Sequence, residues 1–231
     1  MMFTPRIIKH LLIINIIFFV GTQFSSEISY DILSLHYFEN EKFIFSQVFT
    51  HMFMHGNLTH IAFNMFALWM FGSTLVNVWG NNKFIFFYFS CGVGAAIVQM
   101  TATFLNVEPF ISSLADSGMS NEQIMEILRG PIYNEAISGF QRPMVGASGA
   151  IYGVVVAFAF LFPNTKLMLL FPPIPIKAKY LVPLLIIFDL IFGFSSFETG
   201  IAHFAHLGGA LTGFIMMWYW KRNQFNNRRW N

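Results

Sequence analysis

Long blocks of apolar residues alternate with short polar segments along this chain. A helix that crosses a bilayer needs about 20 mostly apolar residues. Six blocks have roughly that length, and they predict spanning helices at residues 7–24, 57–78, 84–105, 144–162, 180–197 and 201–220. The pattern therefore predicts an all-α membrane protein, a six-transmembrane-helix bundle, in one domain over residues 1–231 with short basic tails.

The first block has the layout of a signal peptide, with a basic start at Arg6 and Lys9 followed by a short apolar core at 11–20. A signal peptide ends in a cleavage site with small residues two positions apart. No such site follows in residues 21–26, so we expect an uncleaved first span.

The composition agrees with a chain embedded in lipid. Hydrophobic residues make up 55% and charged residues only 10%, against about 25% charged residues in soluble domains. The net charge of +2 and the scattered basic residues argue against a nucleic-acid partner. The single cysteine, Cys91, excludes an intrachain disulfide. The lipid bilayer is therefore the first partner that we expect.

The charges outside the predicted spans sort onto two sides. One side comprises the N-terminus, the second and fourth loops and the C-terminal tail, and it holds only basic residues: Arg6, Lys9, Lys83, Lys166, Lys177, Lys179, Lys221, Arg222, Arg228 and Arg229. The other side is mainly acidic: Glu27, Asp31, Glu39, Glu41, Glu108, Asp116, Glu122, Glu126, Glu135 and Glu198, with Lys42, Arg129 and Arg142. In membrane proteins, the loops on the cytoplasmic side carry an excess of Lys and Arg. Both termini are therefore predicted to be cytoplasmic.

Two long loops are predicted on the outer side. The first, at about 25–58, becomes rich in aromatic residues and is expected to dip into the membrane interface. The third, at about 106–143, contains Ser120 and Gln123 at the spacing of a capping box, which predicts a short amphipathic helix that covers the surface.

Polar side chains gather at the start of the second, fourth and sixth spans. The second begins with His51, His55, His60 and Asn64, the fourth with Ser148, and the sixth with His203 and His206. Polar residues inside a bilayer are costly and therefore are candidates for function. Because these three spans all run from outside to inside, the groups should lie at one depth near the outer surface.

These residue types suit acyl transfer by a serine nucleophile. A serine hydroxyl needs a base within hydrogen-bond reach, so we interpret Ser148 as the nucleophile and His206 as the base. His60 and Asn64 share one helix face and, with the Ser148 backbone N–H, are candidates to bind an oxyanion. Tyr152 lies one turn below Ser148 and is expected to pack against the His206 ring.

Glycines explain how the two helices approach each other. Gly209 and Gly213 form a GxxxG motif, which allows close packing of helices in membranes. Gly146 and Gly149 flank Ser148 on the other helix. Close packing of the fourth and sixth spans is therefore expected to bring the hydroxyl to the imidazole.

The combined motifs resemble those of the rhomboid proteases. The chain carries HxxxxHxxxN from His55 to Asn64, GxSG at 146–149 and AHxxGxxxG at 205–213, in the order and on the spans typical of that family. The resemblance implies a six-helix rhomboid bundle, a serine–histidine dyad without an acidic third member, and oxyanion contacts from His60 and Asn64. It also implies transmembrane protein substrates and a mobile gate formed by the fifth loop and fifth span.

Two further features bear on the resemblance. The run at 170–179 is similar to that of bacterial members, which favours a bacterial inner membrane with the active site opening to its outer face. The first loop lacks the Trp-Arg pair that many members carry.

Several polar residues have other interpretations. Asp189 is expected to be hydrogen-bonded within the bundle or protonated, rather than to complete a triad. His55 either holds the first loop or takes a direct part in the site. His51 and His203 are interpreted as structural or interfacial, although His203 is a rival base because it lies three residues before His206.

Two other functions compete with proteolysis. A metal site or transporter is suggested by five histidines, yet no HExxH motif is present because Gly56 follows His55 and Ile61 follows His60. No internal repeat supports a transporter, so no metal and no cofactor are expected. A non-cleaving rhomboid-like protein that binds membrane clients would lack the serine or the base, and this chain has both.

Overall fold

The computed structural model describes residues 4–131, 134–168, 174–195 and 199–223. The helices are α1 (Arg6–Phe24), α2 (Ser26–Leu33), α3 (Gln47–Thr50), α4 (Leu58–Ala67), α5 (Ser73–Trp79), α6 (Asn81–Asp116), α7 (Asn121–Arg129), α8 (Glu135–Gln141), α9 (Ser148–Leu161), α10 (Ala178–Gly193) and α11 (His203–Arg222). A 3₁₀ turn (His51–Phe53), a π-helical turn (Leu68–Gly72) and a hairpin of β1 (Lys166–Met168) and β2 (Pro175–Lys177) complete the described elements.

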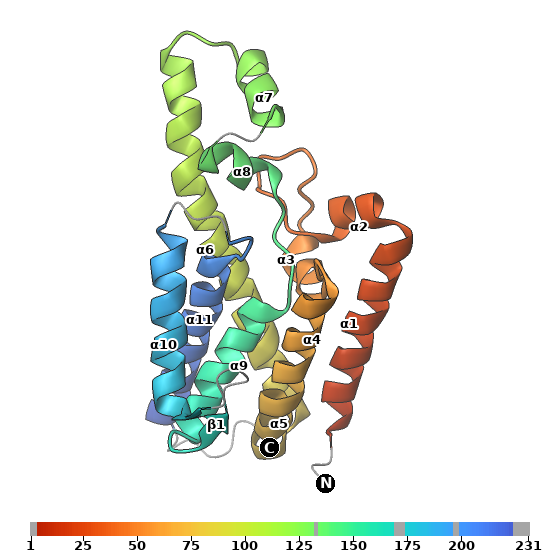
Figure 1. Ribbon diagram of the computed structural model, residues 1–231, viewed down its shortest axis with the longest axis vertical. Coiled ribbons are helices and arrows are strands. Elements are labelled where there is room, and N and C mark those ends of the chain that lie inside the picture. Colours follow the sequence, from red (N-terminus) through yellow and green to blue (C-terminus); the bar gives the residue numbers. More distant parts are fainter. Residues whose placement is uncertain (1–3, 132–133, 169–173, 196–198, 224–231) are drawn as a thin grey trace.

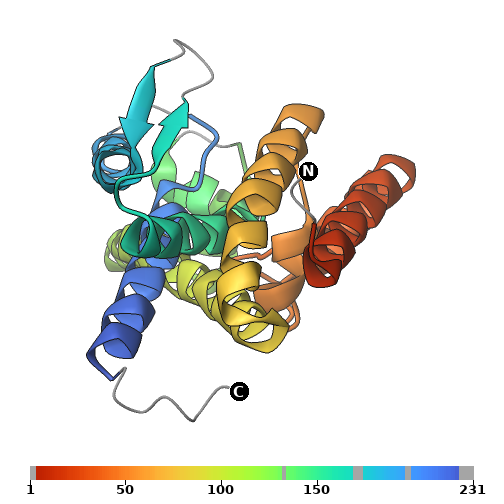
Figure 2. The same ribbon diagram turned by 90° about the horizontal axis from the view of Figure 1, so that it is seen from below.

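The long helices form a bundle with α9 at its centre. Helix α1 begins and α11 ends at the end of the bundle where the β1–β2 hairpin lies, while α7 and α8 lie at the opposite end (Figure 1). Seen from below, α9 is surrounded by the other helices, and α1 stands at the edge (Figure 2). All of Gly149–Ala159 except Tyr152 is buried. A helix that is apolar on every side is stable in such a central position.

Within the described part of the chain, three helices are long and apolar enough to cross a membrane: α1, the continuous segment Leu58–Trp79, and α6. The fourth, fifth and sixth predicted spans overlap α9, α10 and α11, so each of the six blocks contains a helix. Length and composition support three of the six predicted spans, and the count of six stays a prediction. Apolar side chains such as Ile17 on α1 and Ile191 on α10 are 61% exposed, and such outward apolar surfaces suit a lipid solvent.

The helix that contains the third predicted span does not end with that span at residue 105. Helix α6 continues through Pro109 to Asp116 and has 36 residues, a length of about 54 Å, against about 30 Å for the hydrocarbon core. Its last turns are stabilised by packing, because Val107 lies in one cluster with Ile124 and Ile137. Polar residues and a proline resemble a helix end in sequence, but this tertiary contact continues the helix.

The predicted capping box is confirmed. The Ser120 side chain accepts a hydrogen bond from the Gln123 backbone, and the Gln123 side chain accepts one from the Ser120 backbone, at the start of α7. The fourth span begins at Ser148 rather than 144, because Met144 and Leu35 form a backbone bridge with two hydrogen bonds of 2.8 and 2.9 Å.

Helix α10 ends at Gly193, before the predicted end of the fifth span at residue 197. Residue 197 itself, Glu198, Arg228, Arg229 and the segment 169–173 of the fourth loop lie outside the described residues.

Candidate active site

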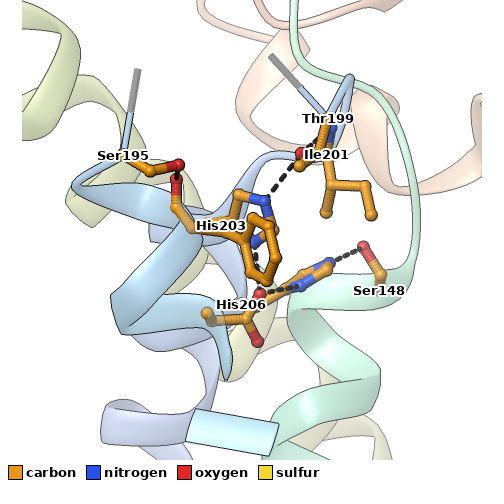
Figure 3. A network of polar contacts seen from close by, with 8 residues as sticks. Ser148, Ser195, Thr199, Ile201, His203 and His206 are labelled. Atoms are coloured by element: carbon orange, nitrogen blue, oxygen red, sulfur yellow. Dashed lines mark hydrogen bonds and ion pairs between the residues drawn. The ribbon is translucent and has the colours of Figure 1, made fainter. Parts of the chain in front are cut away.

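Ser148 and His206 meet at the N-terminal ends of α9 and α11. Ser148 is the first residue of α9, and His206 lies in the first turn of α11. The Ser148 Oγ and the His206 Nε2 are 2.9 Å apart, which is a hydrogen-bond distance (Figure 3). The turn before the serine contains Gly146 with φ of +124°, a conformation that favours glycine. The chain can therefore turn sharply and present the hydroxyl at the end of a helix.

The glycines of α9 and α11 allow this approach. A Cβ atom on Gly209 would collide with the Gly149 backbone, and one on Gly213 would lie 2.7 Å from the Gly153 Cα. Backbone therefore touches backbone along two turns of the pair. The four glycines form the seam that brings the two helices together.

Tyr152 holds the histidine ring from below. Its ring stacks on that of His206 with centroids 4.2 Å apart and an interplanar angle of 13°. His206 is only 9% exposed. A stacked ring in a buried position limits rotation of the imidazole, so its nitrogens keep their directions.

His60 and Asn64 lie on one face of α4. The Gly56 N–H donates to His60 Nδ1 over 3.4 Å, so a neutral His60 carries its proton on Nε2. That Nε2 atom lies 2.8 Å from the position of a Cβ built on Gly146, beside Ser148. The Asn64 Nδ2 is buried and has no acceptor among the described residues. His60 Nε2–H and the Asn64 amide are donors of the kind that can bind an oxyanion, and only the His60 ring is placed next to the Gly146 turn by a distance.

His55 and His51 support the loop around the site. The His55 ring lies edge-on to the His60 ring with centroids 5.0 Å apart. The His51 carbonyl accepts a hydrogen bond of 2.9 Å from the Gly146 N–H, and its Nδ1 contacts the Gln47 carbonyl oxygen at 2.8 Å. His51 therefore fixes the turn before Ser148.

Asp189 lies closer to the serine and histidine than its position in the sequence suggested. Its carboxylate is 1% exposed, and its Oδ1 lies 3.0 Å from His206 Nδ1 and 2.7 Å from His203 Nδ1. It is hydrogen-bonded within the bundle, as expected, but the expected absence of an acidic group beside the serine and histidine does not match this geometry. The sequence signal was a lone carboxylate on an apolar helix at the depth of the other polar groups.

The group Asp189, His203 and His206 also offers three ligand atoms within 4.8 Å of one another. Ligands of one zinc ion, at about 2.0 to 2.2 Å from the metal, stand roughly 3.3 Å apart in a tetrahedron. The contacts of 2.7 and 3.0 Å to Asp189 are shorter and fit hydrogen bonds.

A cavity of about 670 Å³ lies between α6, α8 and the start of α11, and its lining includes His203, Thr199 and Phe204. Neither Ser148 nor His206 is part of that lining.

Comparison with known families decides the relationship of this chain. The family model described as "Rhomboid domain" matches residues 42–223, which is more than half of the chain. The chain belongs to the rhomboid family. The match includes all three motifs that carried the resemblance in the sequence.

Several rhomboid relatives are similar over most of this chain. The presenilin-associated rhomboid-like protein, mitochondrial, of Mus musculus is 30% identical over 182 residues, covering 77% of this chain and 38% of the mouse protein. Its Homo sapiens counterpart has the same identity and coverage. Rhomboid protein 1, mitochondrial, of Saccharomyces cerevisiae is 26% identical over 170 residues, 72% of this chain and 39% of the yeast protein. The chain thus spans about two fifths of these relatives.

Proposed function

We propose that this rhomboid family member is an intramembrane serine endopeptidase that cleaves other membrane proteins within or beside their transmembrane segments. The observation that carries the proposal is the 2.9 Å contact between Ser148 Oγ and His206 Nε2. A nucleophile and a base within hydrogen-bond reach are the minimum requirement for acyl transfer. Rhomboids are generally intramembrane serine proteases, and this chain has the residues that the chemistry requires.

The reaction follows from the two side chains. The Ser148 Oγ attacks the carbonyl carbon of the scissile peptide while its proton passes to His206 Nε2. When the tetrahedral intermediate collapses, the C–N bond breaks and His206 returns the proton to the departing amine. A water molecule, deprotonated by the same imidazole, then hydrolyses the ester, releases the carboxylate product and restores the hydroxyl.

The negative oxygen of the tetrahedral intermediate is bound by donors from α4 and α9. His60 Nε2–H, Asn64 Nδ2 and the Ser148 backbone N–H fill this role, because the first N–H groups of a helix have no intrahelical acceptor. The Asn64 amide, which is buried and meets no acceptor in the part of the chain that the structure describes, supports this assignment. An unused buried donor is costly unless a ligand completes it.

The membrane arrangement consists of six spans with both termini on the cytoplasmic side and the active site toward the outer face. It is supported by the six helical blocks and by the separation of basic from acidic loops. Transmembrane segments of other proteins then approach Ser148 from the lipid.

We propose the bacterial inner membrane as the location of the protein. The relatives described above are named mitochondrial proteins, whereas the fourth loop resembles that of bacterial members. We retain the bacterial inner membrane as the expectation, to be tested by fractionation.

A non-cleaving rhomboid that binds clients is the second candidate function, because the family also contains inactive members. The two functions differ in one assay. Purified protein in liposomes is given a transmembrane peptide with a fluorophore and a quencher on either side of the scissile region. Cleavage separates the two dyes, whereas binding alone leaves them together.

The variants Ser148→Ala and His206→Ala test the proposal. Each is expected to lower cleavage by at least about 10³-fold without changing the thermal unfolding midpoint by more than a few degrees. Ser113→Ala is the matched control, since the Ser113 hydroxyl only bonds its own helix on an exposed surface. A fluorophosphonate should label Ser148 of the wild-type protein. Full cleavage by Ser148→Ala would refute the assignment.

A further inference from the structure

Asp189 requires an explanation that a serine–histidine pair does not provide. A buried carboxylate in a membrane span is costly unless it is paired and hydrogen-bonded. Here it is placed between two imidazoles from α11, with Oδ1 contacts of 2.7 Å to His203 and 3.0 Å to His206. The Tyr152 hydroxyl on α9 also interacts with this carboxylate. Three side chains from two helices thus converge on it.

The positions of the protons follow if Asp189 is ionised. A carboxylate only accepts hydrogen bonds, so His203 Nδ1 and His206 Nδ1 must both donate. The other nitrogen of each neutral ring is then an acceptor. His206 Nε2 therefore receives the hydroxyl proton of Ser148, the direction in which a base must face its nucleophile.

The contacts of His203 continue the same pattern. Its Nε2 lies 2.7 Å from the Thr199 hydroxyl, which itself accepts a hydrogen bond from the Ile201 N–H at 3.2 Å. The Thr199 proton is then free to be donated to His203. Both nitrogens of His203 are occupied, and its ring lies close to that of Phe192. His203 is therefore poorly placed to replace His206 as the base.

We propose that Asp189 is a positioning residue that keeps His206 in the tautomer with an acceptor facing Ser148, and that His203, held by Thr199, keeps the carboxylate in place. This inference rests on the proposed protease function and extends it. In this protein, catalysis then uses a hydrogen-bonded chain from the Asp189 carboxylate through the His206 imidazole to the Ser148 hydroxyl, and not the serine–histidine pair alone. Catalysis is sensitive to such a carboxylate because the wrong tautomer cannot accept the proton.

The variant Asp189→Asn tests the proposal, since an amide has nearly the same shape but can donate where the carboxylate only accepts. We expect kcat for the liposome substrate to fall at least about 100-fold with KM within about twofold, because Asp189 touches the base and not the substrate. The rate of fluorophosphonate labelling of Ser148 should fall with kcat. In the His206→Ala background, Asp189→Asn should have no further effect.

A merely structural role gives a different pattern. Asp189→Asn would then lower the thermal midpoint and the amount of folded protein, leave kcat per folded molecule within about threefold, and add to the His206→Ala defect. A kcat within about threefold of wild type, or a defect that adds to that of His206→Ala, would overturn the proposal.

A second variant protects the test against a failure to fold. Thr199→Val removes only the hydroxyl that holds His203, and we expect a fall in kcat of roughly 3- to 10-fold, about the loss of one hydrogen bond. Thr101→Val is the matched control, because the exposed Thr101 hydroxyl bonds only the Ile97 carbonyl of its own helix. Equal activity of Thr199→Val and Thr101→Val would refute the role of His203 in holding the Asp189 carboxylate.

Two outcomes separate this inference from its alternatives. If Ser148→Ala is inactive while Asp189→Asn is fully active, the protease proposal stands and the role of Asp189 is refuted. If the purified wild-type protein carries one equivalent of zinc that Asp189→Asn lacks, the three residues form a metal site and the positioning role is overturned. Absence of bound metal, with the kcat effect described, supports the proposal.

Discussion

Substitution of Gly213 by alanine tests whether the close contact of α9 and α11 sets the distance between Ser148 and His206. A Cβ atom on Gly213 would lie 2.7 Å from the Gly153 Cα, where ordinary contacts begin at 3.4 Å. The helices must therefore separate locally by about 0.7 Å. Overpacking of this kind costs about 1 to 3 kcal/mol.

The same shift affects the chemistry. The Ser148 to His206 contact of 2.9 Å would lengthen to about 3.6 Å if the whole helix moved, which is beyond hydrogen-bond reach. Misplacement of about 1 Å can lower a rate by about 100-fold. Because Gly213 lies two turns below His206, some of the shift is absorbed along the helix, and we expect a 10- to 100-fold fall in kcat.

The assay is cleavage of the quenched transmembrane peptide, together with the thermal unfolding midpoint. Gly21→Ala is the matched control, since Gly21 lies in α1 and a Cβ atom added to it would meet no described atom within 4 Å. It should keep full activity and gain a few tenths of a kcal/mol in stability. If Gly213→Ala retains kcat within twofold, the seam does not control the catalytic distance.

Three further predictions concern separate parts of the molecule. Asn64→Ala should lower kcat by about 100- to 1000-fold with little change in KM, and a change confined to KM would contradict its oxyanion role. Gly146→Ala should destabilise the fold and lower labelling of Ser148, because φ is +124° and the new Cβ would lie 2.8 Å from His60 Nε2; unchanged labelling would show that the turn tolerates a side chain. Ser120→Ala should cost about 1 kcal/mol of α7 stability, measured by hydrogen exchange of α7, and leave cleavage unchanged.

Much of the fold was accessible from the sequence because a bilayer imposes strong rules. Backbone polar groups in lipid must be satisfied within helices, so apolar blocks such as 7–24 predict helices with nearly correct ends. The capping box at Ser120 was equally local, since its donors and acceptors lie within three residues. The extension of α6 was not accessible, because Val107 is held by residues of α7 and α8 that are distant in sequence.

The sequence by itself determined which residue types occur at the starts of three apolar blocks, and therefore which side chains were candidates for acyl transfer. Periodicity along a helix gives depth and face, but it does not give the distance between helices. Only the tertiary structure decided that Ser148 and His206 are within hydrogen-bond reach, and that Asp189 of α10 lies against two imidazoles of α11. The physical reason is that such contacts depend on how helices distant in sequence pack against one another, including the glycine contacts of α9 with α11, and no single segment encodes that packing.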